Sequence, residues 1–425
     1  MNYHNFTKQI KYDSFKMASL SIEVRNNALL EIKKALSENR EKIVAANALD
    51  LAAAKAENLP GPIAARLKFD EKKLDDALNG ISGLILLPDP LFRNLLEREL
   101  DTGLSLFKTT CPIGVIGVIF ESRPDALIQI SALCVKSGNC SILKGGSEAQ
   151  NSNRALFDII HEAGVKAGLP AGFASLLESR ADIDEILKCH ESIDLIVPRG
   201  SNSFVQYIME KSKIPVMGHA DGICHIYVDK DADLSKAIPV INDAKTQYVA
   251  VCNAAETLIV HKDIAATLLP ALALSLGEKN VALIGCLRTK ELVECEPAAD
   301  DDFYTEHLDY KLSVKIVDSL EEAVFHINKY GSHHTDCIIT ENKKTAEEFM
   351  ESVDSAGVYQ NCSTRFADGF RYGFGAEVGV STGKLHARGP VGLEGLVSYK
   401  YKLFGDGHIV ADYAEGRKSF NFKDK

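Results

Sequence analysis

The chain has 425 residues, and its 48 Lys and Arg against 59 Asp and Glu give a formal net charge of -11 at pH 7. This length predicts two or three domains, and the negative charge disfavours nucleic acid and anionic membrane surfaces as partners. The ten cysteines include no CxxC pair and no His/Cys cluster with zinc-finger spacing, so the sequence predicts no metal site and a reducing, cytoplasmic compartment.

The N-terminal part is predicted to be helical. Its first twenty residues are polar, without the apolar core of a signal peptide or a membrane anchor. From about residue 14 to 59, apolar positions recur at helical spacing, and Pro60-Gly61-Pro62 ends the pattern. The next stretch, to about Leu96, also has a helical pattern, and strand-like segments begin at residues 103–107.

Two α/β blocks follow. Between residues 114 and 228, strands and helices alternate as GVIGVIF, DALIQISALCVKSG, CSILKG, QNSNRALFDIIHEAGVKAG and IDLIVP. This alternation predicts βαβ units with a parallel sheet. A second block contains the predicted strands TLIVH, VALIG, SVKIV and TDCIIT with helices between them. After Val358 the chain is rich in Gly, Arg, Ser and Thr as far as Glu394, where several loops could converge.

Two strand ends carry residues suited to a dinucleotide. The first carries Lys144, Gly145, Gly146, Ser147 and Glu148. The second carries Arg199, Gly200 and Ser201. Glycines allow close backbone approach to a phosphate, and a helix start offers N–H donors. The first segment is neither GxGxxG nor a Walker A motif, and an ordinary turn explains it about equally well. The recurrence at a second strand end favours the cofactor interpretation.

Cys252 is the candidate nucleophile. It lies in AKTQYVAVCNAAETLIV, after polar residues and before Asn253, where backbone N–H groups could stabilise an oxyanion. A cysteine is more often structural, and several others stand in apolar contexts that predict inert packing: Cys134, Cys140, Cys189, Cys224, Cys286 and Cys337. Cys111 and Cys362, on loop-like stretches, remain possible rivals.

Arginines provide local positive charge in this acidic chain. They are Arg123, Arg199, Arg365, Arg371 and Arg388. Bidentate binding of carboxylate or phosphate would explain them, although a surface salt bridge is the more common role of any single arginine.

Together these segments resemble the γ-glutamyl phosphate reductase family of the aldehyde dehydrogenase superfamily. The resemblance covers nearly the whole chain and is densest in GVIGVIFESRPDAL, LKGGSEAQNSN, GHADGICHIYVD, VCNAAETL, GSHHTD and STRFADGFRYGFGAEVGVSTGKLHARGPVGLEGL. It implies an aldehyde dehydrogenase-like α/β fold. It also implies reduction of L-γ-glutamyl phosphate by NADPH to L-glutamate 5-semialdehyde and phosphate, a step of proline biosynthesis, through a thioester on Cys252.

The resemblance further implies a division of the chain. Residues 1–100 would form the N-terminal helical part of the cofactor-binding domain, 101–113 a β oligomerisation flap, and 114–228 the NADP-binding α/β domain. Residues 229–365 would form the catalytic α/β domain, and 366–425 a return segment with substrate loops and an oligomerisation tail. We expect a dimer or larger homo-oligomer through residues 102–109 and the tail after Tyr399, since each would leave a strand edge exposed.

Site roles follow from the matched motifs. Lys144, Ser147 and Glu148 match the superfamily's cofactor segment, and Glu306 matches the glutamate that holds the nicotinamide ribose. Where hydrolytic members carry a general-base Glu, this chain has His219, which agrees with a reduction that needs no activated water. Two departures affect the substrate loop: Tyr248-Val249 replaces Arg-Pro, and His333 replaces Gly.

Substrate recognition requires groups for two anions and one ammonium. We expect Arg123 and Arg388 to bind the anionic groups, with Ser122 and His219 nearby. Glu121 or Asp368 could bind the ammonium. The alternative is that these charged side chains pair with one another and only hold the loops.

Two other functions remain open from the sequence. One is a different aldehyde or acyl phosphate substrate on the same scaffold, against which the missing Glu base argues. The other is a catalytically silent dinucleotide-binding protein, since a fold alone does not give a function. The complete motif around Cys252 disfavours the silent protein.

Overall fold

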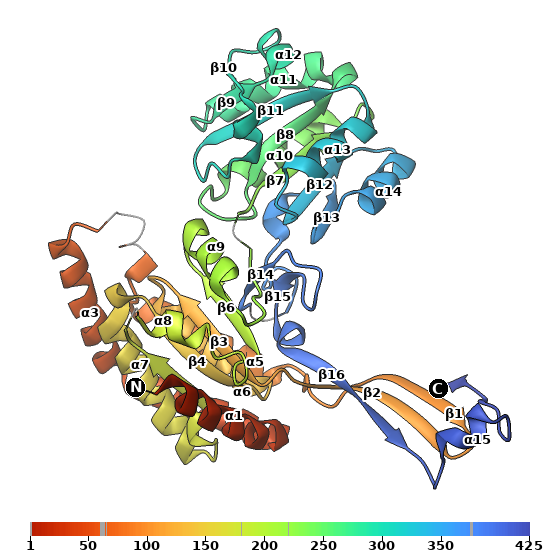
Figure 1. Ribbon diagram of the computed structural model, residues 1–425. Coiled ribbons are helices and arrows are strands. Elements are labelled where there is room, and N and C mark those ends of the chain that lie inside the picture. The colour runs from red at the N-terminus through yellow and green to blue at the C-terminus, as the bar shows by residue number, and fades with distance from the viewer. Residues whose placement is uncertain (1, 60–63, 65, 180, 220, 375–376) are drawn as a thin grey trace. The chain divides into compact units, whose positions relative to one another are not determined.

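The computed structural model describes the chain except for residues 1, 60–63, 65, 180, 220 and 375–376. It divides into two compact units, which are shown in Figure 1. Unit 1 comprises Met1–Met217, Phe374–Gly379 and Val391–Lys425, and unit 2 comprises Gly218–Gly373 and Val380–Pro390. Among the described residues, no helix is long and apolar enough to cross a bilayer.

Unit 1 begins with helices, as predicted. They are α1 (Tyr3–Ser19), α2 (Ile22–Glu38), α3 (Arg40–Ala56) and, further on, α5 (Glu71–Leu86). The single helical pattern is divided where Ser21 caps α2 by accepting a hydrogen bond from the Val24 N–H. The predicted stop at Pro60-Gly61-Pro62 lies outside the described residues.

A four-stranded parallel sheet forms the centre of unit 1, with strand order β5-β4-β3-β6. The strands are β3 (Val115–Phe120), β4 (Cys140–Gly145), β5 (Ala174–Leu177) and β6 (Leu195–Arg199). Helices α6 (Pro124–Lys136), α7 (Gln150–Lys166), α8 (Ala181–Ile186) and α9 (Asn202–Lys211) connect or follow them. Every residue of β3 and β4 is buried, which explains their continuous apolar runs. The predicted βαβ alternation is confirmed, while the short strand β5 was not predicted.

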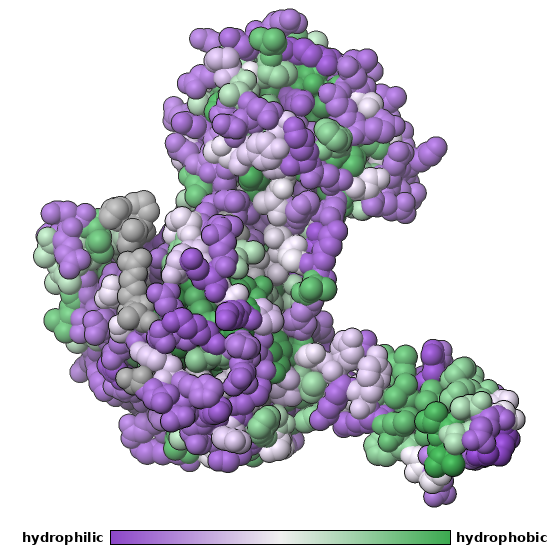
Figure 2. All heavy atoms as spheres, viewed as in Figure 1, coloured by the Kyte–Doolittle hydropathy of each residue, from purple (hydrophilic) through white to green (hydrophobic). Residues whose placement is uncertain are grey.

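A separate antiparallel sheet in unit 1 has the order β16-β2-β1-β17. Its strands are β1 (Asn94–Asp101), β2 (Leu104–Pro112), β16 (Val397–Phe404) and β17 (Lys423–Asp424). The predicted flap at 101–113 is therefore one half of a β1–β2 hairpin, and the helical pattern expected up to Leu96 ends before β1. Apolar side chains remain exposed on this sheet, as Figure 2 shows, and include Leu95, Leu403 and Phe404.

Unit 2 contains a seven-stranded parallel sheet of order β10-β9-β11-β8-β7-β12-β13. The strands are β7 (Cys224–Val228), β8 (Ala255–His261), β9 (Ala282–Gly285), β10 (Glu296–Pro297), β11 (Lys311–Val317), β12 (Thr335–Ile339) and β13 (Gly357–Gln360). The main helices are α10 (Leu234–Thr246), α11 (Lys262–Gly277), α13 (Leu320–Tyr330) and α14 (Lys343–Ser352), with the short α12 (Leu287–Lys290) between β9 and β10.

Helices cover both faces of this sheet (Figure 1). Ile226 and Val260 pack with residues of α10 and α11, whereas Tyr227 and Ile259 pack with residues of α13 and α14. Successive strand residues alternate between faces, so both faces need apolar side chains. Because β7 pairs with β8 and β12, the boundary predicted between residues 228 and 229 lies instead between Met217 and Gly218.

Candidate active site

Three turns meet at the carboxyl edge of the parallel sheet in unit 1. Phe120 pairs with both Gly145 and Arg199, so strands β3, β4 and β6 end side by side. We call the residues at these ends, 121–123, 144–148 and 199–201, the cofactor turns. The sequence predicted such a meeting, because the carboxyl ends of parallel strands share one edge of a sheet.

Carboxylates link the cofactor turns to one another. The backbone N–H and the hydroxyl of Ser122 donate to Glu148 Oε1, at 2.5 and 2.7 Å. The Ser201 N–H donates to Glu121 Oε2 at 2.9 Å. Ser122, predicted to bind substrate, therefore lies with the residues predicted to bind the cofactor. Glu121, considered for the substrate ammonium, is engaged by a backbone N–H.

Glycines in the cofactor turns make room for these carboxylates. A Cβ atom at Gly146 would lie 2.1 Å from Glu148 Oε1, and one at Gly200 would lie 2.5 Å from Glu121 Oε2. Lys144 is buried, and its ammonium donates to the Gly145 carbonyl. These glycines thus serve close packing as well as any approach of a ligand.

A small hollow adjoins the cofactor turns. Its lining includes Gly145, Gly146, Ser147, Gln150, Asn153, Leu176, Leu177 and Glu178. The Oδ1 atom of Asn153 is buried without a hydrogen-bond partner among the described residues. An unpaired buried acceptor next to glycine-rich backbone fits a ligand that carries hydrogen-bond donors, such as a ribose. Asn153 was not predicted, because an Asn in a helix that follows a strand gives no distinct signal in the sequence.

Unit 1 also carries Arg123, the N-cap residue of α6. Its guanidinium lies 3.3 Å from Asp125 Oδ2, and its side chain is 47% exposed. An exposed arginine with one loose ion pair at a strand end remains available to an anion.

In unit 2, Cys252 lies in the connection between α10 and β8. The Ala254 N–H donates to the Val251 carbonyl at 3.1 Å, which closes a turn with Cys252 and Asn253 at its centre. A Cβ atom at Gly222 would lie 2.2 Å from the Cys252 carbonyl oxygen and 2.3 Å from its Cα. The backbone at Gly222 therefore packs directly against the candidate nucleophile, which only glycine permits.

Asn253 ties this turn to a second loop. Its side-chain amide donates to the Ala367 carbonyl at 2.8 Å, and the Thr364 hydroxyl donates to the Asn253 carbonyl at 2.7 Å. Asn253 is nearly fully buried, and its Oδ1 has no partner among the described residues. These contacts give Asn253 a positioning role for the turn.

Two histidines lie beside the Cys252 thiol. One side-chain ligand atom from each of His219, Cys252 and His334 lies within 4.8 Å of the other two. The His219 and His334 rings meet edge to face, with centroids 4.9 Å apart. We call these three residues the His-Cys cluster. His334 was not predicted, although it stands in the quoted motif GSHHTD.

The neighbouring His333, one of the two departures from the family pattern, has a different environment. Its φ is 60°, in the left-handed region that favours glycine, and its Nδ1 donates to the Asp354 carbonyl at 2.6 Å. Glycine adopts this backbone conformation without strain, whereas a histidine does not.

The two members of a buried ion pair lie on either side of residues 251–254, the turn that carries the candidate nucleophile, which we call the nucleophile turn. The Nζ atom of Lys245, in the last turn of α10, lies 2.6 Å from Oε2 of Glu256 on β8. Both side chains are inaccessible to solvent. Burial raises the pKa of Glu256 to about 7 and lowers the pKa of Lys245. The Leu308 N–H also donates to Glu256, at 3.3 Å. Glu256 therefore connects the turn carrying Cys252 with the loop carrying Glu306, and neither member of the pair was predicted.

Arg365 is the most enclosed of the predicted arginines in unit 2. It is 8% exposed, its Nε donates to Gln247 Oε1 at 3.0 Å, and no carboxylate of the described residues forms an ion pair with it. Burial and the neighbouring Arg371 lower its pKa. A guanidinium that lacks a carboxylate partner close to the nucleophile turn suits an anionic ligand.

Arg388, by contrast, already has a partner. Its Nη2 lies 3.0 Å from Asp354 Oδ1, and Lys384 lies 2.6 Å from the other oxygen of the same carboxylate. Asp368 accepts backbone hydrogen bonds from Phe370 and Arg371. These contacts agree with the alternative in which Arg388 and Asp368 hold the loops.

Most other thiols are poorly suited to reaction. Burial raises the pKa of Cys134 and of Cys337 to about 12, and it also raises the pKa of Cys140, Cys224, Cys111 and Cys362. Cys286 differs from the expectation of inert packing. Burial opposes its ionisation, but hydrogen bonds from Thr289 and nearby backbone lower its pKa.

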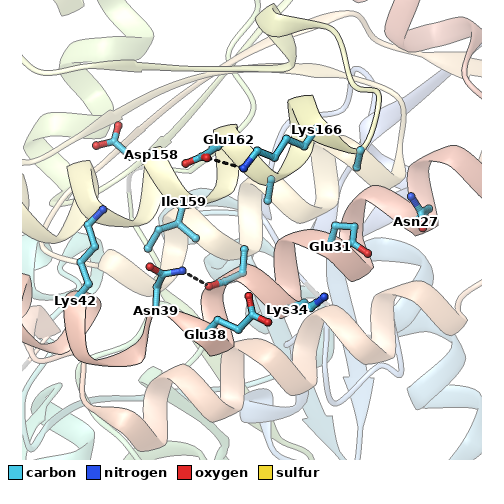
Figure 3. Close-up of a pocket in the computed structure, with 13 residues that line it drawn as sticks. Asn27, Glu31, Lys34, Glu38, Asn39, Lys42, Asp158, Ile159, Glu162 and Lys166 are labelled. Atoms are coloured by element: carbon cyan, nitrogen blue, oxygen red, sulfur yellow. Dashed lines mark hydrogen bonds and ion pairs between the residues drawn. The ribbon is translucent and has the colours of Figure 1, made fainter.

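A wider groove lies between α2 and α7 (Figure 3). Its labelled side chains are mostly charged, and Lys166 pairs with Glu162 at 2.7 Å along α7. The groove lies away from the amino end of α7, where the cofactor turns are, and we assign it no role in catalysis.

Comparison with known proteins identifies the family. Residues 9–281 match the model of the aldehyde dehydrogenase family. The chain is 57% identical over 420 residues to the γ-glutamyl phosphate reductase of Acetivibrio thermocellus, covering 99% of this chain and 97% of that protein. The chain belongs to the γ-glutamyl phosphate reductase family. The relative from Pelotomaculum thermopropionicum is 58% identical over 423 residues, covering 100% of this chain and 98% of that protein.

A solved structure supports the same family membership. The crystal structure of the γ-glutamyl phosphate reductase from Thermotoga maritima matches with a TM-score of 0.93 at 37% identity, covering 95% of this chain and 98% of that one. The predicted aldehyde dehydrogenase-like α/β fold is therefore confirmed, and membership of this family implies a nicotinamide dinucleotide cofactor.

Proposed function

We propose that this chain reduces L-γ-glutamyl phosphate to L-glutamate 5-semialdehyde and phosphate, the step that proline biosynthesis requires, with NADPH as the cofactor. Sequence identities of 57% and 58% to two γ-glutamyl phosphate reductases, over nearly the whole chain, carry this proposal. The Cys252 turn beside His219 and His334 supports it, because reduction of an acyl phosphate through a thioester needs a thiolate and no activated water.

In the proposed reaction, the Cys252 thiolate attacks the acyl carbon and the bond to the phosphate oxygen breaks, which releases phosphate and leaves a thioester. The cofactor, when bound, supplies the hydride that reduces the thioester. The resulting hemithioacetal then releases the aldehyde and regenerates the thiolate. His219 Nδ1 contacts the Val380 carbonyl at 2.9 Å. A carbonyl only accepts, so Nδ1 carries the proton and Nε2 is free to accept the Cys252 proton.

For the cofactor, we propose the cofactor turns as the phosphate and ribose site, with Glu306 on the nicotinamide ribose. Lys144 supplies positive charge next to Gly145 and Gly146, which favours NADP over NAD. The unpaired Asn153 Oδ1 in the adjoining hollow supports a ribose or amide donor there.

For the substrate, we propose Arg123 and Arg365 as the anion-binding arginines, with Ser122 and His219 in supporting positions. Arg365 has no carboxylate partner among the described residues, whereas Arg388 pairs with Asp354. Arg388 can bind the substrate only if the substrate breaks the ion pair between Arg388 and Asp354.

We also propose a homo-oligomer that uses the free edge of β16, in a cytoplasmic compartment. Strand β16 pairs only with β2 among the described strands, and Tyr399, Tyr401 and Phe404 are at least half exposed on it. An apolar edge strand of this length favours pairing with another chain. The ten free cysteines support a reducing compartment. Light scattering that finds an active monomer would dismiss the oligomer.

The function is tested by phosphate-dependent reduction of NADP⁺ by glutamate 5-semialdehyde, the reverse reaction. Wild-type protein should require phosphate, and Cys252→Ser should lose roughly three or more decades of rate. Cys286→Ser is the matched control, because hydrogen bonds lower the pKa of the Cys286 thiol and make it a rival nucleophile. Activity that persists in Cys252→Ser, or a rate that does not depend on phosphate, would contradict the proposal.

A further inference from the structure

The His-Cys cluster combines three side chains, two imidazoles and one thiol, of the types that bind zinc. His219, Cys252 and His334 come from three separate segments, and their ligand atoms lie within 4.8 Å of one another. Tetrahedral zinc with bonds of about 2.0 to 2.3 Å needs neighbouring ligand atoms roughly 3.4 to 3.7 Å apart. The cluster therefore needs to contract by no more than about 1.5 Å, which small side-chain rotations of the half-buried His219 and Cys252 can supply.

Both histidines are already oriented by their second ring nitrogen. His219 Nδ1 donates to the Val380 carbonyl at 2.9 Å, which leaves Nε2 as a lone-pair donor. His334 Nδ1 lies 2.9 Å from the Thr335 hydroxyl. A metal-binding histidine commonly uses such a contact to fix its tautomer and ring orientation.

His334 provides an independent sign of a missing ligand. Its side chain is inaccessible to solvent, yet its Nε2 has no hydrogen-bond partner among the described residues. A buried ring nitrogen without a partner is costly, and a bound group would satisfy it. The loop carrying His334 is also held in place, since the Ile223 N–H donates to the Ser332 hydroxyl at 2.8 Å.

We propose that His219, His334 and Cys252 form a binding site for Zn²⁺ with one coordination position left open. Two imidazoles and one thiolate suit Zn²⁺ rather than Mg²⁺ or Ca²⁺, which prefer oxygen ligands. On binding, the Cys252 thiol forms a sulfur–zinc bond and releases its proton to solvent. The bound ion occupies the nucleophile, so Zn²⁺ is a reversible inhibitor. This inhibition rests on the proposed role of Cys252, whereas the binding itself does not.

The full chain, freed of metal by a chelator, is titrated with Co²⁺ as a spectroscopic probe for Zn²⁺. Binding of one Co²⁺ per chain should give a thiolate-to-cobalt charge-transfer band together with the intense visible bands of a tetrahedral site. Zn²⁺ should displace the Co²⁺, so that both sets of bands disappear. The band should disappear in Cys252→Ser and remain in the control Cys286→Ser. His219→Gln and His334→Gln should each weaken metal binding at least tenfold. His219 is half-buried, so its variant tests the site even if His334→Gln folds poorly.

Protection of the thiol provides a second measurement. Zn²⁺, but not Mg²⁺, should block alkylation of Cys252 by iodoacetamide, as read by mass spectrometry, and a chelator should restore it. A charge-transfer band that survives in Cys252→Ser, or wild-type affinity in His219→Gln, would overturn the site. Metal binding together with full turnover in Cys252→Ser would keep the site and refute the nucleophile. If Cys252→Ser lost turnover but the wild type gave no cobalt band, the role of Cys252 as nucleophile would be kept and the metal site refuted.

Discussion

The cofactor turns of unit 1 and the nucleophile turn of unit 2 are built in different ways. The cofactor turns come directly after buried parallel strands and are joined by carboxylates that accept backbone and hydroxyl hydrogen bonds near the surface. The nucleophile turn depends on contacts from distant segments, including a fully buried ion pair and a glycine packed on the Cys252 backbone.

This difference separates two ways of making a site. The hydrogen bonds between the cofactor turns are partly or fully exposed to solvent, so residues of these turns are expected to change with less effect on folding. A turn supported by buried polar groups links the position of the nucleophile to the stability of its domain. Substitutions that affect folding and chemistry differently in the two regions test this distinction.

The largest effect on stability is expected from Lys245→Met. The substitution leaves Glu256 buried without its counter-ion, which costs about 3 to 5 kcal/mol. The double variant Lys245→Met/Glu256→Met should recover most of that loss, because both charges are then removed. Urea midpoints of the purified variants measure both effects.

The matched control is Lys236→Met, which removes an exposed pair with Glu341 at 2.8 Å. An exposed pair is worth at most about 1 kcal/mol. Equal losses in Lys245→Met and Lys236→Met would mean that the buried pair does not support the turn.

Gly222→Ala should displace the nucleophile, because the added Cβ would lie within 2.3 Å of Cys252 backbone atoms. A shift of about 1 Å at a reacting atom lowers kcat/KM about a hundredfold. Steady-state kinetics and the alkylation rate of Cys252 measure the displacement. Gly277→Ala is the control, since nothing lies within 4 Å of its added Cβ. If Gly222→Ala keeps normal kinetics, the close packing is not required for catalysis.

Lys144→Ala should weaken cofactor binding while folding changes little. Loss of one charge-assisted hydrogen bond, worth about 1.5 kcal/mol, raises the KM for NADPH about tenfold and leaves the KM for semialdehyde nearly unchanged. Lys166→Ala, on the exposed end of α7, is the control. An early melting transition with an unchanged KM would make Lys144 structural, like Lys245, and would remove the distinction between the two regions.

The smallest effect is expected from His326, which is buried in unit 2. Burial and the neighbouring His225 lower the pKa of His326 to about 2. The unfolded chain binds this proton near pH 6.5, whereas the folded chain stays neutral, so stability falls as the pH drops below about 6.5. At pH 5.5 the loss from this one group is about 1.4 kcal/mol.

His326→Phe should flatten that part of the pH dependence, since Phe303 and Tyr330 already surround the ring at 5.0 and 4.4 Å between centroids. Urea unfolding at pH 7.5 and 5.5 measures the change. The exposed His190, replaced by Asn, should leave the pH dependence as it is in the wild type. An unchanged slope in His326→Phe would show that other groups cause the acid sensitivity.

The sequence by itself determined the alternation of strands and helices, the turns that follow β4 and β6, and the placement of Cys252 in the connection before β8. Strand β4 matches its predicted bounds and helix α7 begins at its predicted first residue, because buried strands and amphipathic helices impose patterns on consecutive residues. The same holds for the turns, since glycine and charged residues directly follow each strand.

Only the tertiary structure decided which distant segments meet. The assignment of β7 to the sheet of unit 2 depends on pairing with β8 and β12, which no local pattern records. His334 and the Lys245–Glu256 pair escaped prediction for the same reason. These side chains have their roles through hydrogen bonds, ion pairs and shared burial. Such contacts join residues from separate segments, which only the folded chain brings together.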